Sequence, residues 1–503
     1  MKPEPMWEEK ATRGKGRGEG GGFPRGLLVL LAVGEAFYLY LALRFPLPRL
    51  YATLPPVDYA KLTGYSLGGV ALLLGMYAVL VAGVAKAVRA GMRTGEGSWP
   101  RWRGVVFGGA VLFGGTLLFT YPFFAIDMLF YAVHTRLWLL YGANPLLVPV
   151  ANFPQDPWIA LKGEWINSTS GYSPLWEVVA LVPGILAGSR RFLLHLMGLK
   201  VIALLAYLAD ALLIAAIVRH LRSQEVGWRV LYFAWNPLVL MELVANGHND
   251  GLMLTFLLLA VLLLVREREL AAHGALALSV LIKVTPAFLW PVFWLWGVAR
   301  RPTWRERALY TLAVGAIVLV TLSVFAAFLW PDPTAWQVFH ESDVSSRAPQ
   351  TLAILIAMAL HVEGAYDRAQ GAFRVFFAVA YAGVFAWVWR QVRGRSHTQA
   401  VEHLLHAWLA VLVLLIVLFS SNWRPWYATW IIALAALSPS QVWVWSSLAF
   451  SFTASTGDVF WTNVKWRFRE YLPPLYAHLI GVPYVFGIPA AVAWRLGHRR
   501  ARA

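Results

Sequence analysis

The sequence predicts an all-α fold, a polytopic bundle of transmembrane helices with additional juxtamembrane helices on the extracytoplasmic side. Of the 503 residues, 59% are hydrophobic and only 14% are charged, whereas soluble domains carry about a quarter charged residues. Runs rich in Leu, Val, Ala and Phe recur from about residue 26 to residue 495. Because a helix that spans a bilayer needs about 20 apolar residues, these runs predict about fourteen spans.

The charge balance and the cysteine content exclude several classes of protein. The formal net charge is +17, but most of the excess lies in short segments between the apolar runs. In such positions Lys and Arg set the orientation of the spans and contact anionic lipids, so no nucleic-acid partner is expected. The chain has no Cys, which excludes disulfides and thiolate metal sites.

Composition also divides the chain. Residues 1–25 are polar, Gly-rich and basic, and are predicted to form a disordered cytoplasmic tail. Residues 26–104 are expected to add two transmembrane helices to a larger transmembrane domain at 105–495, which contains a long outer loop at 122–191. Residues 496–503 form a second basic tail, so both termini are expected in the cytoplasm.

Basic segments between the apolar runs set the expected topology. All of them can lie inside only if 174–188 is an outer juxtamembrane helix and 273–298 is a hairpin of two short helices that turns outside near Lys283. These basic segments are 86–103, 219–229, 266–268, 300–307 and 390–395. The segments then left outside, which also hold most of the unusual polar and aromatic clusters, are 122–191, 246–251, 331–371, 421–427 and 456–473.

Asp127 follows an apolar run at about 105–121 and opens the long outer loop. An ionisable side chain at the mouth of a membrane span is costly unless it has a partner or a function. One interpretation is structural, with Asp127 as the N-cap of the following helix, because Asp is favoured at that position. The other is catalytic: a carboxylate that is ionised at neutral pH can act as a general base and accept the proton of an acceptor hydroxyl.

The turn at 246–251 has the sequence Asn-Gly-His-Asn-Asp-Gly. Gly, Asn and Asp are favoured in tight turns, so a purely structural turn is one interpretation. A connection between two apolar helices does not need so many polar side chains, however, and His248, Asn249 and Asp250 are therefore candidates for binding a substrate. A divalent metal held by His248 and Asp250 with Glu242 is the weaker interpretation, because hard cations prefer several carboxylates.

Aromatic and polar side chains also gather at 421–427, which has the sequence Ser-Asn-Trp-Arg-Pro-Trp-Tyr. Enrichment of Trp and Tyr at membrane interfaces is one explanation. Aromatic faces also suit the apolar C–H faces of sugar rings. Trp426 and Tyr427 are therefore candidates for binding a sugar, together with Asn144 and Tyr172 of the outer loop.

A phosphate group on the outer side would need two or three cations, because charge-assisted hydrogen bonds to Lys and Arg stabilise it in a partly dry site. The candidates are Arg136, Lys283, Arg347 and Arg424. Each could instead extend to lipid headgroups. Lys283 is the strongest candidate, since an unpaired ammonium within an apolar hairpin would be costly.

Several of these motifs together resemble the membrane glycosyltransferases of the GT-C fold. Asp127 after a span, an aromatic-rich helix with Arg136 and the Gly-Ala-Asn-Pro sequence at 142–145 are similar to the first outer loop of that fold. Trp-Asn-Pro-Leu at 235–238, followed by Gly-His-Asn-Asp-Gly at 247–251, resembles the polyprenol-phosphate-mannose-dependent α-mannosyltransferases, including the α-(1→6) enzymes that extend lipid-anchored mannans.

Two later motifs strengthen this resemblance, which covers about 105–435. They are Lys283-x-x-Pro286 and Pro425-Trp426-Tyr427-x-x-Trp430. The Gly-His-Asn-Asp match is the specific part of the resemblance, whereas the other motifs recur across many GT-C families.

The resemblance implies an inverting enzyme that transfers a sugar, expected to be mannose, from a polyprenyl-phosphate donor to a hydroxyl of a lipid-anchored glycan or glycolipid. The site would face the extracytoplasmic side of the plasma membrane, within the cell envelope. The implied mechanism is a single displacement with Asp127 as the base. Because phosphate is already a good leaving group, no cofactor and no divalent metal are expected.

A flippase or transporter of lipid-linked glycans is the alternative. Many transporters are built from internal repeats, with broken helices at the bilayer midplane. No repeat is visible in this sequence and its polar residues gather on one side, which favours the enzyme.

Overall fold

The computed structural model describes residues 25–52, 67–94, 99–122, 125–188, 191–330, 364–420, 423–467 and 474–502, and residues 352, 355, 356 and 359. Over these residues the fold is all-helical, as predicted, and its one β-type pairing is an isolated bridge between Pro46 and Thr120. Arg347, most of the predicted outer segment 331–371 and nearly all of the predicted tail 1–25 lie outside the described residues.

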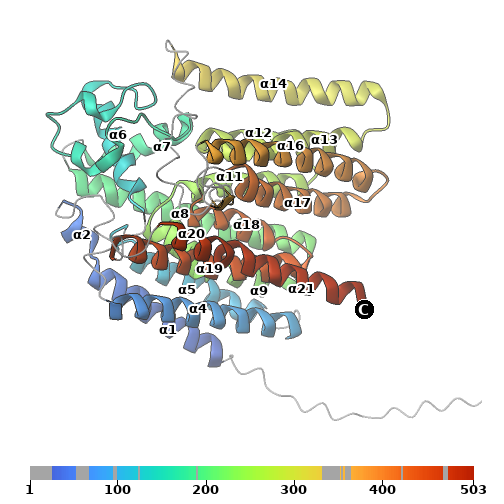
Figure 1. Ribbon diagram of the computed structural model, residues 1–503. Helices are drawn as coiled ribbons and strands as arrows, with labels where there is room; N and C mark the ends of the chain where they lie inside the picture. Colours follow the sequence, from blue (N-terminus) through green and yellow to red (C-terminus); the bar gives the residue numbers. More distant parts are fainter. Residues whose placement is uncertain are drawn as a thin grey trace, which may run out of the picture.

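The long helices run side by side in one helical body (Figure 1). In chain order they are α1 (Arg25–Arg44), α4 (Leu67–Thr94), α5 (Trp99–Leu117), α8 (Phe192–Leu221), α11 (Asp250–Val265), α12 (Glu269–Ile282), α13 (Trp290–Ala299), α14 (Trp304–Leu329), α16 (Ala365–Val392), α17 (His397–Leu414), α19 (Gln441–Arg467) and α21 (Ile488–Arg502). The shorter α-helices of the body are α2 (Leu47–Leu50), α9 (Val226–Ala234), α10 (Pro237–Val239), α18 (Ala428–Ala435) and α20 (Pro474–Val482).

A separate lobe lies at one end of this body and is formed by α6 (Asp127–Tyr141), α7 (Pro174–Ala187) and the segments between them (Figure 1). Within it are the short 3-10 helices η2 (Val150–Asn152) and η3 (Ile159–Trp165). We call these residues, 127–187, the outer lobe, because they belong to the segment 122–191 that the sequence predicts to lie outside. The remaining 3-10 and π-helical turns are η4 (Ser223–Glu225), η5 (Leu240–Ala245), η6 (Thr285–Leu289), η8 (Leu415–Phe419), η9 (Pro425–Tyr427) and η10 (Pro483–Gly487).

Seven helices of the described residues are long and apolar enough to cross a membrane, or eight if the bent pair formed by 237–245 and 250–265 is one span. The described helices therefore do not by themselves supply the fourteen spans expected from the sequence. Four further apolar helices are only 10–17 residues long. At 1.5 Å per residue, such helices extend about 15–25 Å, which is less than the hydrocarbon thickness of a bilayer.

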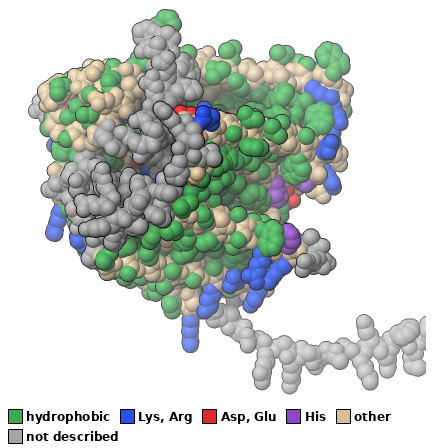
Figure 2. All heavy atoms as spheres, in the orientation of Figure 1, with side chains coloured by type: hydrophobic (Ala, Val, Ile, Leu, Met, Phe, Trp, Pro, Cys, Tyr) green, Lys and Arg blue, Asp and Glu red, His purple; other side chains and the backbone are tan. Residues whose placement is uncertain are grey.

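Hydrophobic side chains cover the middle of the visible face of the body, and Lys and Arg gather mainly along its lower and right-hand margins (Figure 2). Such a belt is typical of a membrane protein. The sequence prediction of a membrane protein is thus supported by both the apolar helices and the surface they form.

Basic segments at the ends of several helices lie near one another. Arg222 pairs with Glu402, and Arg301 pairs with Glu269. His397 Nε2 lies 2.7 Å from the carbonyl oxygen of Leu264, beside the end of α11. Because α11 begins at Asp250 and ends at Val265, the turn at 246–251 lies at the opposite end of this helix from the basic segments.

The Trp-Asn-Pro sequence at 235–237 has a structural function in this chain. Trp235 Nε1 donates to the carbonyl oxygen of Val106 at 2.9 Å, and Asn236 Oδ1 accepts from Leu238 N at 3.0 Å and from Ser451 Oγ at 2.6 Å. Asn236 is thus the N-cap of α10. Pro237 fits the first turn that follows, because an N–H at that position would have no partner within the helix and proline has none to lose. The motif redirects the chain towards the turn at 246–251.

Candidate active site

Asp127 is the first residue of α6, and its side chain is half-buried. The N-cap of α6 is Ile126, with no side-chain hydrogen bond, so Asp127 does not have the capping role that was the structural interpretation. Its Oδ1 atom instead accepts a hydrogen bond from the Tyr172 hydroxyl at 2.6 Å. Burial raises the pKa of Tyr172 well above its usual value, and the nearby Asp127 carboxylate raises it further. Tyr172 therefore stays protonated and donates.

Tyr131 connects Asp127 to the turn at 246–251. It lies one helical turn after Asp127, so the two side chains share a face of α6. The Tyr131 ring packs edge-on against Tyr172 and Trp176, with ring centres 4.7 Å apart in both pairs. Its hydroxyl accepts from the backbone N–H of Asn249 at 3.3 Å. The structure thus brings together two segments that are more than a hundred residues apart in the chain.

The turn itself is sharply bent and buried. The segments 237–245 and 250–265 meet at 114°, and Gly247 has a positive φ of 69°. This backbone conformation favours glycine, and a Cβ atom at Gly247 would also displace the terminal methyl group of Met128. The turn lies against the first residues of α6, where Gly247 is next to Met128 and the Asn249 N–H donates to Tyr131.

Glu242 organises the first half of the turn. Its Oε2 atom accepts from Asn246 Nδ2 at 2.9 Å and lies 3.3 Å from His248 Nε2. The His248 ring stacks on Trp426, with ring centres 4.0 Å apart. His248 is 1% exposed, so it is held between a carboxylate and an aromatic face. Trp426, from the segment 423–427, is thereby placed beside the turn.

Asp250 and Lys283 form the central ion pair of the site. Lys283 Nζ lies 2.9 Å from both carboxylate oxygens of Asp250, and Trp430 Nε1 donates to Asp250 Oδ1 at 2.6 Å. The same ammonium lies 5.3 Å from the ring centre of Tyr427 and 5.4 Å from that of Trp430. The predicted hairpin is confirmed, because α12 ends at Ile282 and Lys283 stands in the turn before α13. Its ammonium is paired, which explains how the charge is accommodated there.

Asp127 lies within electrostatic range of this ion pair. Its carboxylate interacts electrostatically with the Lys283 ammonium and with Tyr427. Arg424 is half-buried, and its guanidinium carbon lies 5.9 Å from the ring centre of Trp426. Among the described residues it pairs with no carboxylate. The site therefore combines a half-buried carboxylate, a cation shared with a second carboxylate, and a cation available to an anionic ligand.

Two predicted site residues have other partners. Arg136 Nε donates to Asp156 Oδ2 at 2.9 Å and to Oδ1 at 3.2 Å, within the outer lobe. It stands nine residues after Asp127 on α6, which corresponds to about 13 Å along the helix. Asn144 Nδ2 donates to the carbonyl oxygen of Phe328 at 2.7 Å, so it fastens the outer lobe to the end of α14. Binding of substrate by either residue stays a prediction.

Lys200 was missed by reasoning from the sequence. It is fully buried in α8 and donates to the carbonyl oxygens of Leu117 at 2.9 Å, Val244 at 3.3 Å and Ala245 at 2.6 Å. It therefore joins the end of α5 to the segment just before the turn. The sequence did contain a sign of this role. Lys200 is a single Lys within the apolar run at 192–218, and an ammonium in such a run needs hydrogen-bond acceptors.

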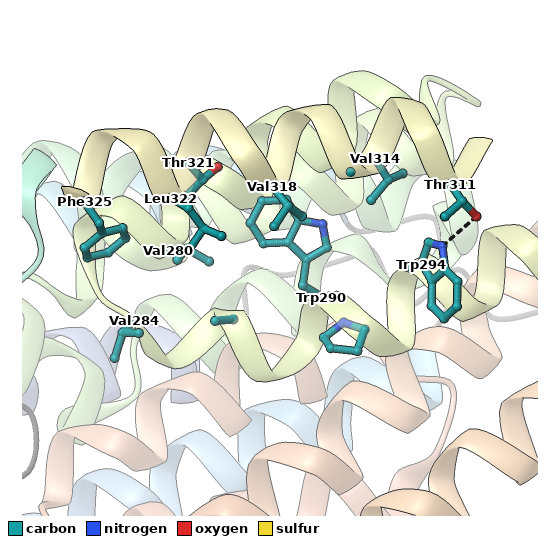
Figure 3. Close-up of a pocket in the computed structure, with 13 residues that line it drawn as sticks. Val280, Val284, Trp290, Trp294, Thr311, Val314, Val318, Thr321, Leu322 and Phe325 are labelled. Carbon is teal, nitrogen blue, oxygen red and sulfur yellow. Dashed lines mark hydrogen bonds between the residues drawn. The ribbon is translucent and has the colours of Figure 1, made fainter. Parts of the chain in front are cut away.

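An apolar groove begins beside Lys283 and runs between α14 and the hairpin formed by α12 and α13 (Figure 3). Its volume is about 690 Å³. Val284 and Phe325 line one end, and Trp290 lines the middle; at the other end Trp294 Nε1 donates to Thr311 Oγ1 at 3.1 Å. From Thr311 to Phe325 the groove follows α14 for about 21 Å. It has the shape and the lining expected for a hydrocarbon chain.

The outer lobe also contains a buried charged cluster, formed by His134, Lys162, Ser170 and Glu177. All four side chains are at most 2% exposed. Glu177 Oε1 accepts from Ser170 Oγ at 2.5 Å and lies 3.6 Å from His134 Nδ1. Lys162 donates to the carbonyl oxygen of Ser168. Burial lowers the pKa of His134 and lowers that of Lys162 to about 8, although Glu177 opposes both changes.

The stability of the lobe should accordingly rise with pH above about 8. The folded chain loses the Lys162 proton near pH 8, whereas the unfolded chain keeps it up to about 10.5. Between these values the unfolded state binds more protons, so the free energy of unfolding increases with pH. Thermal unfolding of the wild type and of Lys162→Met, followed in detergent from pH 7 to 10, should show this rise only in the wild type. Parallel curves would contradict the assignment.

Comparison with known proteins agrees with these features. Residues 50–300, about half of the chain, match the family model described as Alpha-(1->6)-mannopyranosyltransferase, N-terminal domain. Among curated proteins, the chain is 23% identical over 184 residues to Alpha-(1->6)-mannopyranosyltransferase A of Corynebacterium glutamicum, covering 36% of each chain. It is 26% identical over 223 residues to the protein of the same name from Mycobacterium tuberculosis, covering 42% of each chain.

The aligned regions therefore span only about two fifths of the length of the curated relatives. No solved structure matches the chain at a comparable level of significance. The matched residues 50–300 include Asp127, the turn at 246–251 and Lys283. Through this segment, the chain belongs to the α-(1→6)-mannopyranosyltransferase family.

Proposed function

We propose that this protein is an inverting membrane glycosyltransferase, which moves a mannosyl group from a polyprenyl-phosphate donor to a hydroxyl of a lipid-anchored glycan or glycolipid. The observation that carries the proposal is the electrostatic interaction of the Asp127 carboxylate with the Lys283 ammonium, in a site that also holds Trp426 between the contacts it makes with His248 and Arg424. The family match supports mannose as the sugar. The GT-C architecture and the count of about fourteen membrane spans stay predictions.

In the proposed reaction, the acceptor hydroxyl oxygen attacks the anomeric carbon of the donor. The bond between that carbon and the phosphate oxygen breaks, and its electron pair leaves with the polyprenyl phosphate. The acceptor proton passes to Asp127 as the new bond forms. Attack opposite the leaving group inverts the anomeric centre, so a β-linked donor gives an α-mannoside.

Charge balance supports a phosphate at this site. Asp250 offsets the charge of Lys283, but Arg424, which lies near Trp426 and interacts electrostatically with Tyr427, pairs with no carboxylate of the described residues. A phosphate between these cations would gain charge-assisted hydrogen bonds in a partly dry site. The developing negative charge on the leaving phosphate would be stabilised in the same way.

The apolar groove supports a lipid-linked donor. It begins at Val284, next to Lys283, so a phosphate near the Lys283 ammonium would have its hydrocarbon chain at the mouth of the groove. A chain lying there would run along α14 (Figure 3).

The site is proposed to face the extracytoplasmic side, with both termini in the cytoplasm. The basic segments at 219–229, 266–268 and 300–307 lie at the ends of helices opposite to the turn at 246–251. Lys and Arg are enriched in cytoplasmic loops, which supports this orientation.

The test is sugar transfer by the purified protein in detergent. Polyprenyl-phosphate mannose and the matching glucose and arabinose donors would be offered separately with a lipid-linked α-mannoside acceptor. Transfer from the mannose donor alone, with an α-linked product, is the expected result. Stable binding of a lipid-linked glycan without transfer from any donor would instead favour a flippase.

Chelation of divalent metals is expected to leave most of the activity intact. Both carboxylate oxygens of Asp250 are engaged by Lys283, and phosphate leaves without the help of a metal. Activity would be measured with and without EDTA, using the same donor and acceptor. A complete loss that added Mg²⁺ or Mn²⁺ restores would contradict this expectation.

A further inference from the structure

The outer lobe contains a chain of hydrogen bonds that ends on Asp127. Glu177, which is fully buried in the first turn of α7, accepts from Ser170 Oγ at 2.5 Å. Ser170 Oγ in turn accepts from the backbone N–H of Tyr172 at 3.1 Å. The Tyr172 hydroxyl donates to Asp127 Oδ1 at 2.6 Å. Glu177 thus holds Ser170, and Ser170 holds the backbone of Tyr172, whose hydroxyl contacts the proposed base Asp127.

Other contacts restrict the same segment. Ser170 N donates to the carbonyl oxygen of Pro145 at 2.7 Å, and Lys162 donates to that of Ser168. The Tyr172 ring is held against Tyr131. With its backbone and its ring both restrained, the Tyr172 hydroxyl has little freedom to leave Asp127.

We propose that Tyr172 is a positioning residue that orients the Asp127 carboxylate, and that the Glu177–Ser170 pair sets the place of Tyr172. This inference rests on the proposed role of Asp127 as the base. It differs from the sequence prediction that Tyr172 binds the sugar. Of the two carboxylate oxygens of Asp127, only Oδ1 receives a hydrogen bond from the described residues, which leaves Oδ2 for the acceptor hydroxyl in the proposed reaction.

The chemical effect on Asp127 is twofold. A hydrogen bond donated to a carboxylate favours its ionised form, which is the form that accepts a proton. Fixing one oxygen also orients the other, and a general base must lie within hydrogen-bond reach of the proton that it removes. Tyr172 would therefore affect the rate of transfer more than the binding of either substrate.

Tyr172→Phe is the first test. We expect kcat for transfer from polyprenyl-phosphate mannose to fall by about 10-fold or more, with KM for the donor changed by less than about twofold. The acid limb of the pH profile of kcat should move to higher pH, because the ionised carboxylate has lost a donor. An unchanged kcat with an unchanged pH profile would overturn the proposal, as would an effect confined to KM.

Tyr141→Phe is the matched control. The Tyr141 hydroxyl also donates to a carboxylate of the outer lobe, Asp156 Oδ2, at 3.4 Å, and within the described part of the chain it makes no hydrogen bond to Glu177, Ser170, Tyr172 or Asp127. This variant should keep the kcat and the pH profile of the wild type. A loss equal to that of Tyr172→Phe would show that any missing phenol in the lobe has the same effect, which would overturn the specific role of Tyr172.

A double-mutant cycle tests the link through Ser170. Ser170→Ala alone should lower kcat and shift the acid limb in the same direction as Tyr172→Phe. In the Tyr172→Phe background it should add no further loss of kcat, because residues that act through one another are not additive. Full additivity would overturn the link, even where both single variants are less active.

Hydrogen exchange gives a readout that does not depend on activity. Ser170→Ala removes the acceptor of the Tyr172 amide, so exchange of the segment 166–176 should become faster while that of α8 stays unchanged. Unchanged exchange in 166–176 would contradict the proposed role of Ser170. If Asp127→Asn is inactive but Tyr172→Phe is fully active, this inference fails alone. If Asp127→Asn is also active, the proposed function fails with it.

Discussion

Replacing Asp127 with Asn is expected to lower kcat for mannosyl transfer by about 10²–10⁴-fold, which is the range that a positioned general base contributes. The amide cannot take up the proton of the acceptor hydroxyl. Its carbonyl oxygen can still accept the hydrogen bond from Tyr172, which Asp127 Oδ1 receives at 2.6 Å in the wild type. The variant should therefore fold and bind the donor as the wild type does, while losing turnover.

The measurement is initial rate against donor concentration, together with donor binding to the protein in nanodiscs. Asp367→Asn is the matched control, since Asp367 is an exposed carboxylate in the first turn of α16 and is not part of the site. It should keep wild-type rates. Substantial turnover by a well-folded Asp127→Asn variant would remove Asp127 from the role of base.

Removing the Lys283 ammonium is expected to have the second large effect, on donor binding. Lys283→Met alone leaves Asp250, which is fully buried, without its cation. Breaking such a pair from one side costs about 3–5 kcal/mol of stability. The single variant should therefore unfold at a lower temperature, and its loss of activity would be hard to interpret.

The double variant Lys283→Met/Asp250→Asn separates binding from folding. It removes both charges and should recover much of the stability, because no buried charge remains unpaired. We expect its affinity for polyprenyl-phosphate mannose to fall at least about 10-fold, since a charge-assisted contact to phosphate is lost. Affinity for the uncharged acceptor should change less.

Arg301→Met/Glu269→Gln is the matched control for this double variant. It removes another ion pair, with an N–O distance of 2.8 Å, at the opposite end of the helical body. Its donor affinity should equal that of the wild type. If Lys283→Met/Asp250→Asn binds the donor normally, Lys283 does not hold the phosphate, and Arg424 becomes the first candidate.

The sequence was informative where the signal is local. Apolar runs predict membrane helices because each run must satisfy its own backbone in the bilayer, and the described helices confirm this class. The hairpin that turns at Lys283 follows from charge placement, and the structure confirms it. The number of spans was harder to predict, because short apolar helices, broken helices and bends such as the one at 114° interrupt the simple relation between run length and crossing.

Charge partners could not be predicted from the sequence. Arg136 and Lys283 are both cations in segments predicted to lie outside, yet Arg136 pairs with Asp156 in the outer lobe and Lys283 with Asp250 in the site. Tyr172 was expected to bind a sugar, and the structure places its hydroxyl on Asp127. Which acidic group a side chain meets depends on contacts between distant segments, and no local pattern contains them.

The sequence by itself therefore determined the helical membrane class and the family to which its motifs point, and it selected Asp127 and the turn at 246–251 as candidates for the site. Hydropathy and charge are properties of short stretches of chain, so membrane helices can be predicted from the sequence alone. Only the tertiary structure decided that Lys283 pairs with Asp250 and interacts electrostatically with Asp127, and that Val284, the next residue, lines an apolar groove. Those relations arise from helix packing, in which burial and geometry select the partners of each polar group.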